Sequence, residues 1–86
     1  MDDDDKPILR RTIRGHLAER PTVSLSPVTL HSRYEREFGG ELKDYETACL
    51  FLVSLGAAEE VKDPMGGREK FYRITAKGII AHERGD

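Results

Sequence analysis

The 86-residue sequence predicts an α+β fold in which three helices precede a β-hairpin and a short final helix. Apolar residues recur with helical spacing in the first two thirds of the chain. A Pro-Met-Gly-Gly turn then separates two short alternating segments, and a threonine suited to cap a helix follows the second of them. A chain of this length has room for one hydrophobic core, so we expect a single domain over residues 7–84.

Residues 1–6 form an acidic leader that we expect to be disordered, because its consecutive aspartates repel one another and nothing apolar anchors them. The run Asp2–Asp5 followed by Lys6 matches the recognition sequence of the protease enteropeptidase and could be a remnant of cloning. Against that origin, Pro7 would hinder cleavage after the lysine. The folded domain is therefore expected to begin at Pro7.

A first helix is predicted over residues 7–20, with Pro7 in the first turn, where the missing N–H costs nothing. Its buried face is a stripe of residues spaced four apart: Leu9, Ile13 and Leu17. Pro21 ends this helix. Residues 22–25 are β-branched in part and could form a brief strand.

A second helix is predicted from Pro27 to the glycine pair at 39–40. Ser26 is a favourable N-cap, and Pro27 suits the first helical position. The glycines accept the left-handed conformation that ends many helices. The buried stripe of this helix is expected to contain Leu30, Tyr34 and Phe38.

A third helix is predicted from about Leu42 or Asp44 to Leu55, ended by Gly56. Its expected core face is Tyr45, Ala48, Cys49, Leu52 and Leu55. Leu50 falls on the opposite face with Phe51 at its margin, although a phase shift of one position would bury Leu50. Cys49 is the only cysteine, which excludes a disulfide within the chain, and its position indicates a small buried hydrophobe.

The hairpin is predicted to pair residues 58–62 with residues 70–74 around a turn that contains Gly66 and Gly67. Alternation directs two side chains of the second strand, with Val61 of the first, onto the helices: Tyr72 and Ile74. Thr75 is expected to cap the final helix, which would bury Ile79 and Ile80. Gly78 lowers the helix propensity there, which indicates a close-packed position or a short helix.

The order helix, short strand, helix, helix, hairpin, helix is that of a winged helix-turn-helix domain, here a three-helix bundle with a C-terminal hairpin wing. The segment GREKFYRITAKG, residues 67–78, resembles the second wing strand and the following helix start of MarR- and PadR-like bacterial regulators. The resemblance implies the fold. It does not imply the dimer geometry of those regulators, because the long helices by which they dimerise are missing from this sequence.

A winged helix of this kind implies a small regulator of bacterial or phage type that binds double-stranded DNA, with the third helix in the major groove and the wing on phosphates. The expected contacts are Lys62, Arg68, Lys70 and Arg73 on the hairpin, Lys43 and Thr47 on the third helix, and Arg10, Arg14, Arg33 and Arg36 on the first two helices. Each cation could equally be an ordinary solvated charge. The third helix lacks Arg, Asn and Gln and carries Asp44 and Glu46, so we expect mostly backbone contacts and limited base readout.

Leu50 and Phe51 predict an exposed apolar patch, a feature that marks protein interfaces. We therefore expect a homodimer, formed through the third or the first helix. The alternative function is a protein-interaction module that does not bind DNA.

Enzymatic activity is not expected, because the sequence contains no nucleophile elbow, phosphate loop or Cys/His pair. We likewise expect no cofactor, no metal ion and no small-molecule substrate. The sequence has neither a run of apolar residues long enough for a membrane span nor a signal peptide, so a cytoplasmic location is predicted. The net charge of −2 is unevenly distributed: residues 44–63 hold five acids and one base, and residues 64–86 hold five bases and three acids.

Overall fold

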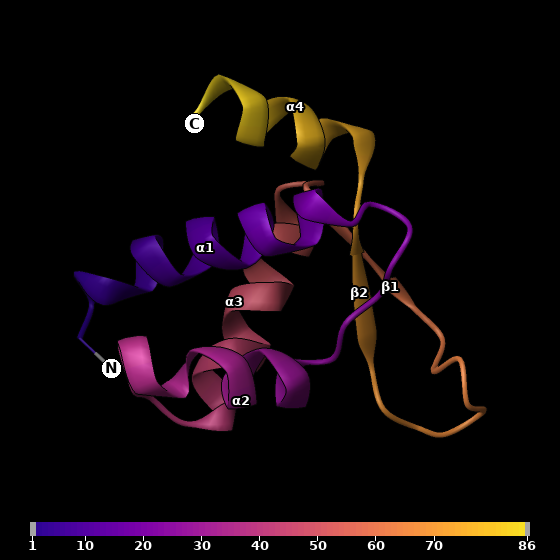
Figure 1. The fold of residues 1–86 in the computed structure, drawn as a ribbon, viewed down its shortest axis with the longest axis horizontal. Helices are drawn as coiled ribbons and strands as arrows, with labels where there is room; N and C mark the ends of the chain where they lie inside the picture. Colours follow the sequence, from indigo (N-terminus) through magenta and orange to yellow (C-terminus); the bar gives the residue numbers. More distant parts are fainter. Residues whose placement is uncertain (1, 86) are drawn as a thin grey trace.

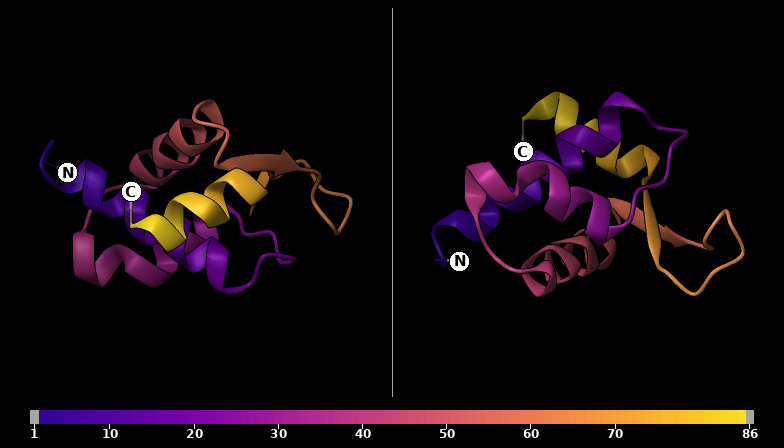
Figure 2. Two further views of the ribbon diagram at one scale, coloured as in Figure 1. Left: turned by 90° about the horizontal axis from the view of Figure 1, so that it is seen from above. Right: turned by 60° about the horizontal axis from the view of Figure 1, so that its bottom comes forward.

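The computed structural model describes residues 2–85, and this part of the chain folds into four helices and one two-stranded antiparallel sheet (Figure 1). The α+β class expected from the sequence is confirmed. The elements are α1 Asp5–Glu19, α2 Pro27–Phe38, α3 Leu42–Ser54, β1 Ala58–Val61, β2 Phe71–Ile74 and α4 Ala76–Arg84. Helices α1, α2 and α3 form a bundle, α4 lies over α1, and the hairpin projects away from the helices (Figures 1 and 2).

Helix α1 begins inside the segment that was expected to be disordered. Asp5 and Lys6 belong to its first turn, and Lys6 Nζ lies 3.1 Å from a carboxylate oxygen of Asp3. An acidic residue at a helix N-terminus is favourable because the first backbone N–H groups carry partial positive charge. Pro7 stays within the first turn, where its missing N–H has no cost. The predicted start of the first helix at Pro7 is therefore wrong by two residues. Met1, the first residue of the predicted leader, lies outside the described residues.

The predicted N-caps of α2 and α4 are confirmed. The Ser26 hydroxyl accepts a hydrogen bond from the N–H of Thr29 at 3.3 Å, and the Thr75 hydroxyl accepts one from the N–H of Gly78 at 3.1 Å. The Thr75 hydroxyl also donates to the carbonyl oxygen of Gly56 at 2.6 Å. This second bond joins the beginning of α4 to the end of α3, so one side chain both starts a helix and fixes its position.

The hairpin has the expected pairing, shortened by one residue on each strand. Ala58 pairs with Ile74 and Val61 with Phe71, which leaves the flanking lysines outside the sheet. Leu25 bonds to the other edge of β2 through backbone hydrogen bonds of 2.9 and 2.8 Å with Tyr72. The strand expected at residues 22–25 is thus reduced to a single bridge.

One continuous core lies between the helices and the inner face of the hairpin. Its largest members are Leu9, Ile13 and Leu17 of α1, Leu30 of α2, Tyr45, Cys49 and Leu52 of α3, and Tyr72 and Ile74 of β2. The apolar stripes predicted from spacing supply almost all of it. Tyr34, Phe38 and Ile79 are only partly buried and pack at its margin.

Two predicted core residues are exposed. Leu55 is 51% exposed because α3 ends at Ser54, so Leu55 caps the helix and does not continue its buried stripe. Ile80 is 49% exposed because the inward face of the nine-residue α4 is occupied by Gly78 and Ile79. Cys49 is fully buried as expected, and this burial, with the charge of Glu46, raises the pKa of its thiol to about 12.

Gly78 marks the closest approach between α4 and the chain that leaves α3. A Cβ atom added at Gly78 would collide with the carbonyl oxygen of Ala57 and come within 2.7 Å of the Ile74 side chain. The carbonyl carbon and oxygen of Ala57 belong to the backbone and cannot move aside. The close packing suggested by the sequence is confirmed, and it requires glycine at this position.

Gly78→Ala is expected to lower the free energy of unfolding by about 2 kcal/mol, because overpacking against fixed backbone outweighs the better helix propensity of alanine. Gly15→Ala in α1 is the matched control, since a Cβ there meets only the end of the His82 side chain, at 2.9 Å. That ring can rotate away, so the control is expected to be unchanged or stabilised by up to about 1 kcal/mol. Urea denaturation of both variants tests this, and stabilisation by Gly78→Ala would contradict the packing described.

Candidate nucleic-acid interface

Helix α3 buries one face and opens the other to solvent. Its buried residues are Tyr45, Ala48, Cys49 and Leu52, and its exposed ones include Lys43, Glu46, Thr47, Leu50 and Ser54. Leu50 is 51% exposed and Phe51 is 41% exposed. The predicted helical phase is therefore confirmed, and the phase that would bury Leu50 is excluded.

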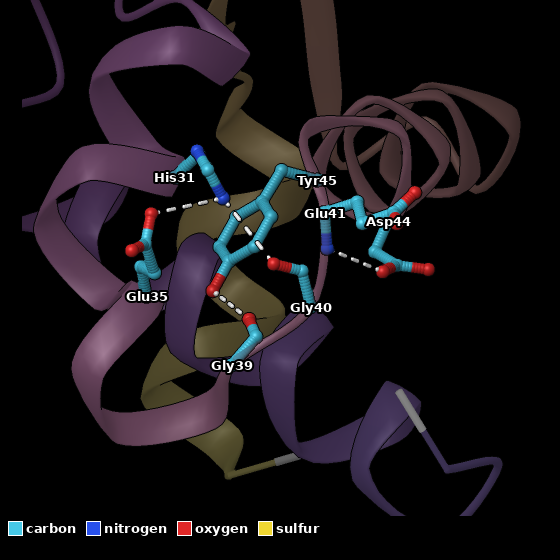
Figure 3. Close-up of polar contacts among 7 residues, drawn as sticks. All are labelled: His31, Glu35, Gly39, Gly40, Glu41, Asp44 and Tyr45. Carbon is cyan, nitrogen blue, oxygen red and sulfur yellow. Dashed lines mark hydrogen bonds and ion pairs between the residues drawn. The ribbon is translucent and has the colours of Figure 1, made fainter.

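Tyr45 anchors α3 to the turn that precedes it (Figure 3). Its side chain is completely buried, and its hydroxyl donates a hydrogen bond to the carbonyl oxygen of Gly39 at 3.0 Å. Burial, followed by the nearby carboxylates of Glu35 and Asp44, raises the pKa of Tyr45, so the hydroxyl keeps the proton that it donates. The ring of His31 meets the Tyr45 ring edge-on, with centroids 5.1 Å apart.

Further polar contacts hold the same turn (Figure 3). His31 Nε2 lies 3.3 Å from the carbonyl oxygen of Gly40 and 3.2 Å from a carboxylate oxygen of Glu35. At the start of α3, the N–H of Glu41 donates to a carboxylate oxygen of Asp44 at 2.8 Å, which forms half of a capping box. Asp44 is thus used to begin the helix. The negative charge of Asp44 is therefore partly compensated by the backbone N–H of Glu41.

The hairpin tip presents three exposed cations: Lys62, Arg68 and Lys70. They surround an open hollow of about 490 Å³ whose other lining residues include Asp63 and Glu69. Arg73, also expected as a contact, lies on the outer face of the sheet, where its Nε donates to a carboxylate oxygen of Glu59 at 3.1 Å. Its charge is therefore compensated within the sheet, and the three tip residues carry the positive charge of the hairpin.

A second group of predicted contacts meets where α1 passes the beginning of α3. Arg10, Lys43 and Thr47 line one hollow of about 200 Å³ together with Lys6. The Arg10 guanidinium lies 3.9 Å from the centre of the Phe51 ring, within the range of a cation–π contact. Residues far apart in the sequence are thus brought together. Lys6 was overlooked because it follows the acidic run that was set aside as a leader.

The remaining predicted contacts lie elsewhere. Arg14 is only 9% exposed, because this edge of α1 packs against the last turn of α3, and it does not offer the exposed guanidinium that a phosphate contact needs. Arg33 lines a separate hollow with His16 and Arg20, to which α3 contributes no residue. Arg36 is exposed in the last turn of α2.

Leu50 and Phe51 do not form the single patch that was expected. Leu50 lies on the hairpin side of α3, where Pro27, Val28, Leu50, Tyr72, Glu46, Glu69 and Lys70 line a groove of about 300 Å³. Phe51 lies on the α1 side, in a hollow of about 130 Å³ with Pro7, Arg10 and Leu55. The separation follows from the 100° turn between consecutive helical residues. Val28, which is 51% exposed, was not identified from sequence because it falls outside the buried stripe of α2.

Together these hollows show which side chains lie at each edge of the exposed face of α3. Lys70 of the hairpin lies at one edge beside Glu46 and Leu50, and Arg10 of α1 lies at the other edge beside Lys43 and Thr47. The apolar groove is on the hairpin side of the face, where Lys70 lies beside Glu46 and Glu69, and the α1 side has an excess of positive charge, with Lys6, Arg10 and Lys43 beside Asp44. A polyanion would meet a cation at both borders of this face, with the excess of positive charge on the α1 side.

Comparisons of the chain with models of known protein families, with curated protein sequences and with solved structures gave no match. No helix within residues 2–85 has the length and apolar character needed to cross a membrane. In the same part of the chain, His, Cys, Asp and Glu side chains form no group of three that could hold a metal ion.

Tyr45→Phe removes the bond to Gly39 and is expected to lower the free energy of unfolding by about 1 kcal/mol, since a partly buried carbonyl loses its partner. Tyr72→Phe is the matched control, because Tyr72 is equally buried and its hydroxyl has no hydrogen bond within residues 2–85. Thermal unfolding of the two variants makes the comparison. Equal losses would show that the Tyr45 hydroxyl does not hold the turn.

Proposed function

We propose that this protein is a winged helix-turn-helix domain that binds double-stranded DNA as a small transcriptional regulator of bacterial or phage type. The observation that carries the proposal is the arrangement of cations around the exposed face of α3. Arg10 from α1, Lys43 from α3 and Lys70 from the hairpin border this face, although they are distant in the sequence. A cytoplasmic location is part of the same proposal.

The dimensions and the charges agree with insertion of α3 into a major groove. An α-helix with its side chains is about 10–12 Å wide, and the major groove of B-DNA is about 12 Å wide. Phosphates line both borders of that groove, where the cations at the two edges of α3 would meet them. The hairpin tip extends beyond α3 and would reach the next phosphates or the minor groove, as wings do in this class of fold.

Removal of the hairpin cations tests the proposal. Affinity for a random duplex should fall with salt by about 0.9 log units per log unit of salt for each phosphate neutralised. The double variant Arg68→Ala, Lys70→Ala should therefore reduce this slope by about 1.8. Fluorescence anisotropy across a salt series measures it.

The matched control is Lys77→Ala, Arg84→Ala, which removes the same charge from exposed positions on α4. This variant is expected to keep the slope of the unchanged protein. If both double variants alter the slope equally, the effect comes from net charge and not from the hairpin. If the unchanged protein does not bind duplex even at low salt, the proposal of DNA binding fails.

A protein-interaction module without DNA binding is the second candidate function. The half-exposed pair Val28 and Leu50 favours it, because these side chains form the apolar wall of a groove with two carboxylates at its rim. Apolar patches of this kind mark interfaces. This function would leave duplex unbound at every salt concentration.

We further propose a homodimer that uses the α1 side of α3. Phe51 and Leu55 are exposed there beside Pro7, and their burial in a partner would add to the small core of this chain. Multi-angle light scattering should give the mass of two chains, and Phe51→Glu should give the mass of one. A monomer for the unchanged protein at high concentration would contradict the dimer and leave DNA binding unaffected.

A further inference from the structure

The groove on the hairpin side of α3 has an apolar lining, which plays no part in binding phosphates. Val28 from the first turn of α2 and Leu50 from the middle of α3 are each 51% exposed, and Pro27 and Tyr72 complete the apolar lining. Leu50 shares the open face of α3 with Thr47 and Lys43. If α3 enters the major groove, this apolar surface must meet the edges of bases, because phosphates lie only along the borders.

One base alone presents an apolar group there. Thymine carries a C5-methyl group on its major-groove edge, and aliphatic side chains recognise it by direct contact. The carboxylate of Glu46 lines the same groove. As an acceptor it disfavours guanine O6 and N7 and thymine O4 alike, and it can accept a hydrogen bond from the amino group of cytosine or adenine, so selection of thymine depends on the apolar surface alone.

The position of the groove, next to a cation of the hairpin, is also suitable for contact with DNA bases. Lys70 and Glu69 of the hairpin line it on the side away from α3. Lys70 can thus hold a phosphate at the border of the groove that Leu50 and Val28 line. Lys70 offsets only one of the two carboxylates that line the groove, so the attraction to DNA must come mainly from the cations on the α1 side of α3.

We propose that this groove reads thymine through its C5-methyl group, with Leu50 and Val28 as the contact surface. The inference rests on the proposed DNA binding and adds the base class that α3 would select. It also assigns a reading function to a helix that lacks Arg, Asn and Gln. Leu50 is then a specificity residue, while the cations at the edges supply affinity that does not depend on sequence.

The test begins with selection of preferred sequences from a random duplex library by the unchanged protein. The enriched duplex is then made in two forms, one with thymine and one with uracil, which differ only in the C5-methyl groups. The unchanged protein is expected to bind the uracil form about fourfold more weakly for each methyl group in contact, the effect of one buried CH₂-sized group. The double variant Val28→Ala, Leu50→Ala, which removes both contacting side chains, should bind the two forms with equal affinity.

Ile80→Ala is the matched control, because Ile80 is 49% exposed, close to the value for Leu50, and lies on α4, outside the groove and outside the hollow proposed for the dimer. It should keep the preference for thymine. Thermal unfolding of both variants establishes that each is folded at the temperature of the assay.

Equal affinity of the unchanged protein for the two forms would overturn the inference, and so would binding to the library without enrichment of any sequence. In both cases DNA binding itself would stand. Absence of binding to any duplex would instead overturn the proposed function, and the inference with it.

Discussion

The anchoring of α3 by Tyr45 is the interaction on which the rest of the structure depends. This side chain is fully buried, and its hydroxyl is bonded to the backbone of the turn before the helix. It determines which face of α3 enters the core, and therefore which face remains open. Rotation of α3 by one residue would bury Leu50, remove Tyr45 and Leu52 from the core and displace Lys43 relative to Arg10. The candidate interface exists because that rotation is prevented.

A second constraint positions the hairpin relative to α3. Thr75 bonds to the carbonyl oxygen of Gly56, and Gly78 allows α4 to approach Ala57 without a collision. These contacts connect both ends of the hairpin to the end of α3, so the cations at its tip have a defined place beside the open face. Most of the tip is formed by polar residues and glycine, which leaves its contacts available to a partner.

Much of the fold could be predicted from the sequence, because buried stripes, N-caps and the glycine turn are local patterns. The site was harder to predict, since its geometry depends on how elements cross. Arg14 lies on the arginine-rich side of α1, yet packing against α3 buries it. Leu50 and Phe51 are neighbours in sequence but line different hollows, and Val28 joins Leu50 only through the fold. The periodicity of apolar residues within one helix does not predict which residues of different helices come into contact.

We propose that the open face of α3 and the hairpin tip contact DNA together. Titration of the isotope-labelled protein with random duplex at low salt, followed by amide chemical shifts, tests this claim most directly. The shifts of Lys43, Thr47 and Leu50 and of the hairpin tip around Arg68 are expected to change, and those of α4 are expected to stay the same. Changes confined to α4, or no changes at any residue, would contradict it.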